Sequence, residues 1–510
     1  MSAVAKAEPP TGQPGRVDGP AVVQGDALVG LRSATGAALI AATVLASAVG
    51  TLDANVIKVA VPAIGRGLHA NVSALQWTLT GYLLTVAALL LLTGALADRF
   101  GRRRVLVVGL LVMLGSAILC SVAPSVDVLI GARIGQGVGG ALVVPSSLAL
   151  LNGTLRASDR ARGIGIWAGL EALATTVGPY AGGWLVGHVS WRAVFLLNVP
   201  LILAGLLMLR RVPESDKARG ALSFDSFGGL LAVIGLGGLI YALTAGPASG
   251  WTSAPVLASV IVGLVSLAAL VPVERRRRAP MLRLSLFASR QFDAINVTTV
   301  LLYGALSAAS YLVFLQLELR LGYSPAQAGA ALIPESAVFL VIAPLSGALV
   351  SHVGPRWLMV SGILMVAGAF VWLSAAHPGA SYAQAILPGA LLWGLGIGLT
   401  VTPLTAAVLA AASDVDLGEA SGVNDASSRV GGVIVIALVP VLIGAGAGRS
   451  FTHSLANGFQ PTMIVMGVIC VVAALIAAVF VTDGHPHGPR VVPHAGDHSC
   501  GFPIPDPATP

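Results

Sequence analysis

Charged residues are scarce in this chain of 510 residues. Only 10% of the residues are Asp, Glu, Lys or Arg, whereas 56% are hydrophobic and the mean hydropathy is +0.87. A soluble globular protein carries about 25% charged residues. The shortage of charge therefore excludes an ordinary soluble protein and predicts an integral membrane protein.

Cysteine and lysine are also rare. The chain has three cysteines, and Cys120 and Cys470 lie in apolar runs, which argues against both a disulfide framework and a metal site. The His-rich tail around Cys500 has no fixed ligand spacing, so we predict no metal and no cofactor. Of the 29 basic residues only three are lysine, and this bias suggests a GC-rich bacterial genome.

Long apolar runs dominate the rest of the chain, and each is near or above the ~20 residues that a helix needs to cross a bilayer. They predict fourteen spans, at about 34–60, 74–97, 105–124, 127–151, 163–187, 193–210, 226–246, 254–273, 292–317, 326–350, 357–376, 383–411, 420–445 and 461–482. Residues 1–33 and 483–510 are expected to be disordered tails. No signal peptide is expected, because the first apolar run starts late.

Basic residues are distributed unevenly between the turns. Eighteen Lys or Arg residues lie in turns after even-numbered spans, and four (Arg66, Arg192, Arg320 and Arg449) lie in turns after odd-numbered spans. This bias predicts that both termini are cytoplasmic. Because the arginines are confined to short turns, the net charge of +7 does not indicate nucleic-acid binding. No turn exceeds about 20 residues, which leaves no room for a soluble catalytic domain, so we do not expect an enzyme.

The turn between the second and third runs combines small residues with charges. It reads GALADRFGRRR from Gly94 to Arg104 and includes Asp98, Arg99, Gly101, Arg102 and Arg103. The stretch resembles the signature loop of the major facilitator superfamily and matches it at every fixed position. The resemblance implies an all-α membrane transporter with a cytoplasmic gating loop at these residues.

A weaker copy of this turn reveals an internal repeat. Gly347–Arg356 reads GALVSHVGPR and is identical to Gly94–Arg103 at five of ten positions, with Ser351 in place of Asp98. The copies are eight spans apart rather than six, so two spans are inserted between two six-helix bundles. The predicted bundles are residues 34–211 and 291–482, with residues 212–290 as the insertion.

Two charged residues fall inside predicted spans at similar depth. Asp53 lies in LDANVIKVAVP (52–62), which resembles the first-span signature of the fourteen-span drug:proton antiporters, except that Lys58 replaces the usual Asn. Arg133 lies in a segment similar to the fourth-span motif of the superfamily. Intramembrane charges are functional candidates, so we predict proton coupling by Asp53 and Arg133, although both also admit a structural role. Lys58 is expected to snorkel to the surface.

The fifth span contains Gly178-Pro179-Tyr180-Ala181-Gly182-Gly183, which resembles the motif that marks antiporters within the superfamily. Glu171, two turns upstream, is a candidate substrate or proton site because burying it is costly. Glu335 is another, either facing a cavity that receives cations or paired with Lys58 or Arg320. Further matches to the family lie around Trp191, Asn198 and Pro200 and at 418–432. Spans that could line the cavity carry Tyr303, Tyr311, Phe314, Gln316 and Trp393.

The resemblance implies a proton-coupled antiporter that exports small lipophilic or cationic compounds, such as drugs, antibiotics or dyes, across the bacterial plasma membrane. Its expected partners are these substrates, protons and the lipid bilayer. Two alternatives stay open. One is a nutrient symporter of the same fold, against which the antiporter motif argues. The other is a membrane sensor or anchor with a protein partner, for which the short turns offer little surface.

Overall fold

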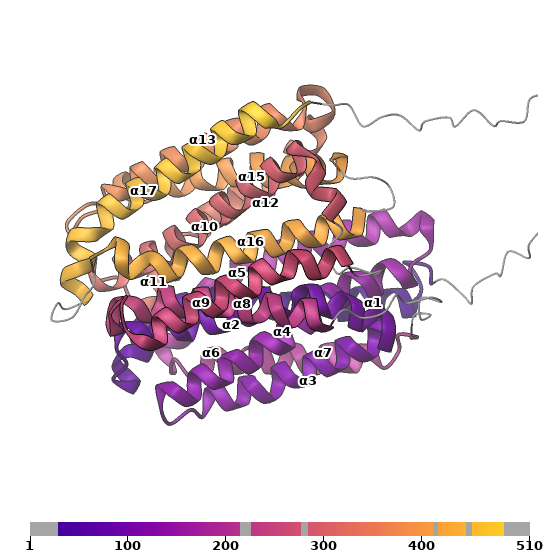
Figure 1. Cartoon of the computed structure of the whole chain (residues 1–510), viewed down its shortest axis with the longest axis horizontal. Coiled ribbons are helices and arrows are strands. Elements are labelled where there is room, and N and C mark those ends of the chain that lie inside the picture. Colours follow the sequence, from indigo (N-terminus) through magenta and orange to yellow (C-terminus); the bar gives the residue numbers. More distant parts are fainter. Residues whose placement is uncertain (1–28, 215–225, 277–283, 412–416, 445–450, 484–510) are drawn as a thin grey trace, which may run out of the picture.

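The computed structural model describes the chain outside residues 1–28, 215–225, 277–283, 412–416, 445–450 and 484–510. Within the described ranges the secondary structure is helical, apart from one isolated backbone bridge between Val29 and Leu155. Long helices run side by side along the longest axis of the molecule (Figure 1).

The first half of the chain forms a bundle of six spanning units. The units are α1 (Ala34–Leu68), α2 (Val72–Phe100), α3 (Arg102–Ser121), α4 (Val126–Thr154), α5 (Ala157–His188) and the consecutive helices α6 (Ala193–Leu196) and α7 (Asn198–Leu209). We call this the N-bundle.

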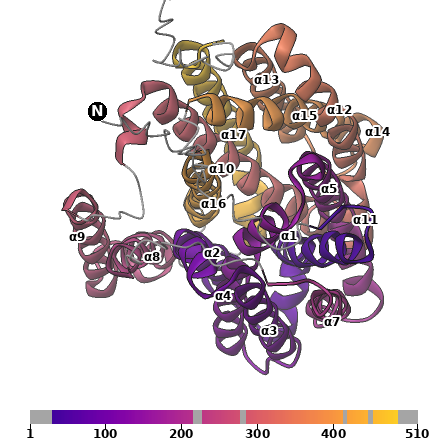
Figure 2. The ribbon, with the colours of Figure 1, turned by 90° about the vertical axis from the view of Figure 1, so that its right-hand side faces the viewer.

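The second half repeats the arrangement after a short 3-10 turn, η1 (Leu284–Ala288). Its units are α10 (Arg290–Leu319), α11 (Pro325–Ala331) with α12 (Ile333–Val353), α13 (Pro355–Ser374), α14 (Tyr382–Ala385) with α15 (Leu387–Ala410), α16 (Leu417–Leu442) and α17 (Phe451–Phe480). We call this the C-bundle. Figure 2 shows the two bundles facing each other when the molecule is viewed along its helices.

Two further helices, α8 (Ser226–Ser249) and α9 (Ala254–Arg276), lie beside the bundles and not within either one (Figure 2). They pack against each other, and α8 also contacts α2 of the N-bundle and α16 of the C-bundle. The rings of Trp77 on α2 and Tyr241 on α8 are 5.9 Å apart. The inserted pair therefore covers one of the seams at which the two bundles meet.

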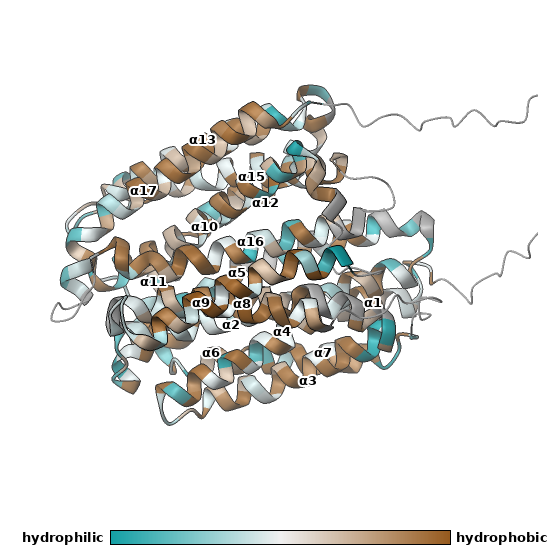
Figure 3. Cartoon of the chain, viewed as in Figure 1, coloured by the Kyte–Doolittle hydropathy of each residue, from teal (hydrophilic) through white to brown (hydrophobic). Residues whose placement is uncertain are grey.

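All fourteen predicted spans coincide with these helices or broken helix pairs. Twelve of the described helices are long and apolar enough to cross a membrane. The other two predicted spans are α5, with 32 residues, and the apolar pair α6–α7 over Ala193–Leu209. Hydrophobic residues predominate along most of the length of the helices (Figure 3). On α9, for example, Ile261, Leu264 and Val265 are more than half exposed, as expected for side chains that face lipid.

The chain reverses at two ends of this helical body. We call the end that carries Gly101, Arg156 and Gly354 the basic end, and the end that carries His69, Val189 and Arg320 the opposite end. The tail residues nearest to α1 are attached to the basic end: the amide of Val29 donates to the carbonyl of Thr154 at 2.9 Å, and that of Leu31 to Asp159 Oδ2 at 2.9 Å. Residues 1–28 of the predicted N-terminal tail lie outside the described part of the chain.

Candidate functional site

A buried ion pair joins α1 to α4. Asp53 accepts a hydrogen bond from Arg133 Nη1, and the exposed fractions of the two residues are 4% and 0%. The second carboxylate oxygen of Asp53 accepts from Gln136 Nε2 at 3.1 Å and from Asn198 Nδ2 at 2.9 Å. Asp53 is therefore surrounded by hydrogen-bond donors from α4 and α7.

The guanidinium of Arg133 is held by α2 as well. Its Nε donates to the carbonyl of Thr78 at 3.0 Å, and its Cζ lies 4.5 Å from the ring centre of Tyr82. Tyr82 is itself fixed by donating its hydroxyl to the carbonyl of Gly50 at 3.1 Å. An arginine stacked on an aromatic ring and paired with a carboxylate can stay charged inside a membrane. Four helices thus meet at this pair.

The glycines of the antiporter motif allow α5 to approach two other helices. A methyl group on Gly178 would come within 2.8 Å of the Leu52 side chain, and one on Gly182 would overlap with Val56. These two α1 residues flank Asp53 in the sequence. The motif therefore packs α5 directly against the part of α1 that carries the buried carboxylate.

The other face of the same motif contacts the C-bundle. A methyl group on Gly183 would overlap with the backbone of Pro325 at the start of α11, and one on Gly329 in α11 would overlap with the carbonyl of Pro179. Each of these close backbone approaches depends on the glycine that forms one side of the contact, because a glycine has no side chain. The antiporter motif thus lies between α1 and the facing bundle.

Glu171 lies on α5 and contacts α1 two residues before Asp53. Its Oε1 accepts from the hydroxyl of Thr51 on α1 at 2.9 Å. It also interacts electrostatically with Arg429 and Asp425 on α16, whose Nε and Oδ2 are 3.2 Å apart. Glu171 of the N-bundle therefore lies near an ion pair of the C-bundle. Sequence reasoning singled out Glu171, whereas Arg429 and Asp425 were covered only by the family match at 418–432, and Asp425 had no predicted role.

The expectation that Lys58 snorkels to the surface is wrong. Its exposed fraction is 8%, and its ammonium donates to Asn55 Oδ1 at 3.2 Å and to Ser310 Oγ on α10 at 3.4 Å. Lys58 and Glu335 also interact electrostatically across the two bundles. Snorkelling fails because α1 is an interior helix, so its lysine meets the facing bundle before it can reach the membrane surface.

Glu335 therefore has Lys58 as its charged neighbour, and its Oε2 accepts from the Ser336 hydroxyl at 2.9 Å. Glu335 was predicted either to face a cavity that receives cations or to pair with Lys58 or Arg320. The structure has the second arrangement, with Lys58. Arg320 lies instead beside a separate cavity in the C-bundle.

The turn at Gly94–Arg104, which we call the basic turn, has a backbone conformation at Gly101 that favours glycine. Gly101 joins α2 to α3 with φ +102°, and Gly354 joins α12 to α13 with φ +83°. The amide of Arg103 donates to Glu214 Oε1 at 2.9 Å, and the amide of Arg356 donates to Asp483 Oδ1 at 3.1 Å. In both copies of the internal repeat a carboxylate therefore lies at the start of the helix that follows the turn, α3 or α13. A negative charge there complements the helix dipole.

The arginines of this turn bind within the N-bundle. Arg102 Nη1 donates to the carbonyl of Ala149 at 3.0 Å, and Arg103 Nε donates to that of Leu209 at 2.8 Å. Arg99 lies over the ring of Phe100. The side chain of Asp98 and the surroundings of Gly94 lie outside the described part of the structure.

The bundles meet near the opposite end. Besides the α5–α11 contact, Gln76 at the start of α2 donates to the carbonyl of Ile436 near the end of α16 at 2.9 Å. Arg66 at the end of α1 interacts electrostatically with Glu318 at the end of α10. These contacts join the two bundles at the opposite end.

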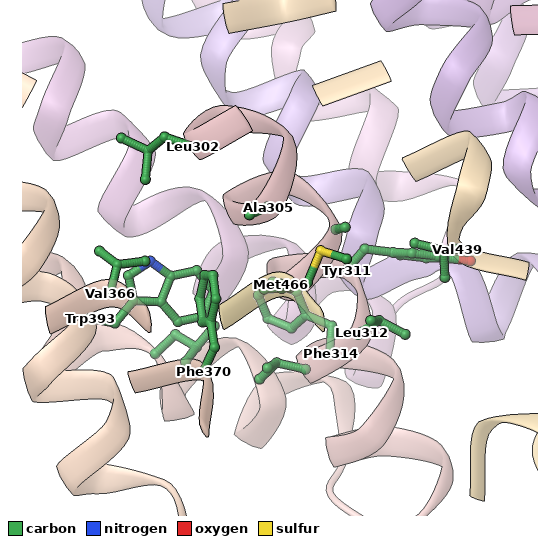
Figure 4. Close-up of a cluster of buried hydrophobic side chains, with 14 of the residues drawn as sticks. Leu302, Ala305, Tyr311, Leu312, Phe314, Val366, Phe370, Trp393, Val439 and Met466 are labelled. Atoms are coloured by element: carbon green, nitrogen blue, oxygen red, sulfur yellow. The ribbon is translucent and has the colours of Figure 1, made fainter. Parts of the chain in front are cut away.

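The aromatic residues considered for a cavity pack in the C-bundle core. Tyr311, Phe314 and Trp393 are buried, and the ring of Trp393 meets that of Phe370 edge-on with centroids 4.9 Å apart (Figure 4). Gln316 donates to the carbonyl of Ala376 at 2.8 Å. Tyr311, Phe314, Gln316 and Trp393, four of the five residues predicted to line a cavity between the spans, therefore contact other residues of the C-bundle.

Two packed helical bundles, an internal repeat and a buried ion pair near their interface define a membrane transporter. The family model of the Major Facilitator Superfamily matches residues 43–436 and 295–501. The chain belongs to this superfamily, which confirms the resemblance carried by the GALADRFGRR turn.

Curated relatives cover most of the chain. It is 34% identical over 397 residues to the multidrug resistance protein Stp of Mycobacterium tuberculosis, covering 77% of this chain and 73% of that one. It is 32% identical to the tetracenomycin C resistance and export protein of Streptomyces glaucescens, covering 82% and 79%. It is also 32% identical to a methylenomycin A resistance protein of Bacillus subtilis, covering 88% and 95%.

Solved structures support the fold. The D-xylose–proton symporter superposes with a TM-score of 0.63 at 16% identity, covering 88% of this chain and 98% of that one. The inward-open xylose transporter XylE from E. coli superposes with a TM-score of 0.62 at 16% identity, covering 89% and 98%. At this identity the likeness concerns the fold alone.

Proposed function

We propose that this chain is a proton-coupled antiporter that exports hydrophobic or amphipathic small molecules, including drugs, antibiotics and dyes, by alternating access. The observation that carries the proposal is the buried Asp53–Arg133 pair on α1 and α4, with the antiporter motif packed against α1 beside it. The resistance and export names of the relatives support the substrate class.

The coupling follows from two environments for one carboxylate. A carboxylate alone in a low-dielectric interior binds a proton, whereas one beside a guanidinium stays ionised. In the described conformation Asp53 accepts hydrogen bonds from Arg133, Gln136 and Asn198, and we assign this arrangement to the step of the cycle that carries no proton. Movement of α1 away from α4 separates Asp53 from Arg133 and allows proton uptake. Arginine keeps its charge in proteins, so Asp53 is the member of the pair that we propose carries the proton.

The antiporter motif transmits this movement. Gly178 and Gly182 contact α1, and Gly183 and Pro179 contact α11. When the bundles rock, a shift of α11 acts on α5, and α5 acts on the segment that carries Asp53. The bistable element is therefore the packed α1–α5–α11 stack, whose arrangement both the proton and the substrate bias.

The energetics are sufficient for export. One proton moving down ~1 pH unit releases ~1.4 kcal/mol, and ~100 mV adds ~2.3 kcal/mol per charge. The sum supports a gradient of several hundredfold for a neutral substrate, because ~1.4 kcal/mol corresponds to a factor of ten. A monovalent cation exchanged for one proton gains only the pH contribution, so cation export benefits from a second acidic group.

Glu171 is the proposed second group. It accepts a hydrogen bond from Thr51 and interacts electrostatically with Arg429 and Asp425 of the C-bundle, which places an acidic group at the interface between the bundles. Glu335 is a weaker candidate, because Lys58 already opposes its charge.

The basic turn is proposed as the cytoplasmic gate, with both termini on the same side of a bacterial plasma membrane. The excess of arginines at this end supports that orientation. The contacts that join the bundles at the opposite end then close the outer face of the transporter. We propose that Asp98 and Arg102 engage the start of α16 when the inner face closes, where the positive end of a helix dipole can meet Asp98.

The decisive experiment uses energised inverted vesicles that contain the purified chain and a lumenal pH dye. Addition of an exported compound should release protons from the lumen, because an antiporter moves substrate and protons in opposite directions. A nutrient symporter would move both in the same direction. The matched control is the Asp53→Asn variant in the same vesicles. A panel of antibiotics and cationic dyes that leaves the lumenal pH unchanged in wild-type vesicles would refute antiport.

A further inference from the structure

A polar cavity lies inside the C-bundle at the opposite end, away from the bundle interface. It has a volume of about 290 Å³ and is formed by α10, the end of α13 with the following turn, and α17. The side chains that bring polar atoms to it include Gln316, Arg320, His377 and Gln460. Neither the coupling pair nor the antiporter motif contributes to this cavity.

Two buried polar atoms beside the cavity have no hydrogen-bond partner among the residues that the structure describes. Gln316 is 6% exposed, and its Oε1 accepts no hydrogen bond although its Nε2 donates to the carbonyl of Ala376. The Nε of Arg320 is likewise buried without an acceptor. An acceptor and a cationic donor that are both unsatisfied call for a ligand that supplies the complementary groups.

The charge of the lining is of one sign. Among the described residues of the lining, Arg320 carries a charge and none is acidic. Glu318, two residues earlier on α10, interacts with Arg66 of the N-bundle instead. The cavity therefore favours an anion, and the free oxygen of Gln316 adds a preference for an anion that also carries a hydroxyl group.

The position of the cavity along the helices indicates which kind of anion can reach it. Arg320 is the residue directly after α10, and the turn at 375–378 directly follows α13, so both lie where spanning helices leave the hydrocarbon. Phosphate groups of lipids are found at this level. We propose that the cavity binds the headgroup of an anionic phospholipid with free hydroxyls, such as phosphatidylglycerol. Its phosphate would face Arg320, and a glycerol hydroxyl would donate to Gln316.

Native mass spectrometry of the purified full chain in detergent tests this proposal. The probes are phosphatidylglycerol, phosphatidylcholine, glycerol 3-phosphate and inorganic phosphate. Wild-type protein should retain one phosphatidylglycerol in preference to phosphatidylcholine. Arg320→Gln should weaken that binding by about tenfold or more, because a charge-assisted contact is lost.

The matched control is Arg192→Gln, which removes an arginine from the same end of the N-bundle. Gln460→Glu is the second variant: it places a negative charge at an exposed position of the cavity lining, where folding is not at stake, and should also weaken phosphatidylglycerol binding. Equal binding to the wild type and to both C-bundle variants would overturn the proposal, as would an equal loss in the Arg192 variant. Arg320-dependent binding of free phosphate or glycerol 3-phosphate, without retention of the lipid, would overturn the lipid assignment.

Discussion

Replacing Asp53 by Asn removes the charge that balances Arg133 while keeping the shape of the side chain. The guanidinium is fully buried, so the variant leaves an uncompensated charge among α1, α2 and α4. Breaking a buried pair by removing one partner costs about 3–5 kcal/mol. We expect a clear loss of thermal stability in detergent and complete loss of proton exchange, with substrate binding retained.

The assay is drug-induced proton release from purified protein in weakly buffered detergent, followed across a pH series. Wild-type protein should release protons on binding substrate, because substrate favours the state in which Arg133 contacts Asp53. Asp53→Asn should release none. Arg133→Lys should keep partial release with a shifted pH profile, because lysine supplies charge but not the planar fork, and Arg133→Ala should lose it.

Asp127→Asn is the matched control, since Asp127 lies exposed in the first turn of α4, the helix that carries Arg133. It should release protons like the wild type. If Asp53→Asn releases protons with wild-type amplitude, Asp53 is not the coupling site and Glu171 takes its place. If it neither binds substrate nor releases protons, the pair is structural and the coupling argument fails.

Three further predictions concern the neighbouring groups. Glu171→Gln should reduce resistance to permanently cationic dyes more than to neutral compounds, by roughly 1–3 kcal/mol in apparent binding, whereas Glu335→Gln should affect both classes alike; equal losses in the Glu171 variant would contradict a cation site. Gly183→Val should abolish transport in vesicles while the protein still inserts, because its side chain overlaps with Pro325; normal transport would show that the α5–α11 contact is dispensable. Asp98→Asn should slow turnover with little change in substrate affinity measured in detergent, and the reverse pattern would reject the proposed gate.

Much of the architecture was determined by the sequence itself. Hydropathy is a local property, because each span must cover the same thickness of hydrocarbon with its own residues. The fourteen spans, the inserted pair α8–α9 and the superfamily could therefore be predicted without a structure. The depth of Asp53 and Arg133 could be counted along their spans in the same way. The charge of the turns is likewise local, and it led to the prediction of orientation.

Only the tertiary structure decided which side chains meet. Two residues at one depth can point to different sides of their helices, so depth alone did not place Arg133 on Asp53. Gln136 and Asn198 lie in segments that resemble the family, yet their bonds to one carboxylate depend on how α1, α4 and α7 pack. Lys58 was misjudged because its depth along α1 does not reveal that the C-bundle faces it.

The same limit applies to the antiporter motif and to the conformation. Its glycines indicate close packing, but their partners on α1 and α11 are more than 100 residues away from them in the sequence. Contacts of this kind depend on the relative position of two rigid bundles, and alternating access changes that position while the sequence stays the same. Which end is joined is therefore a property of the folded state.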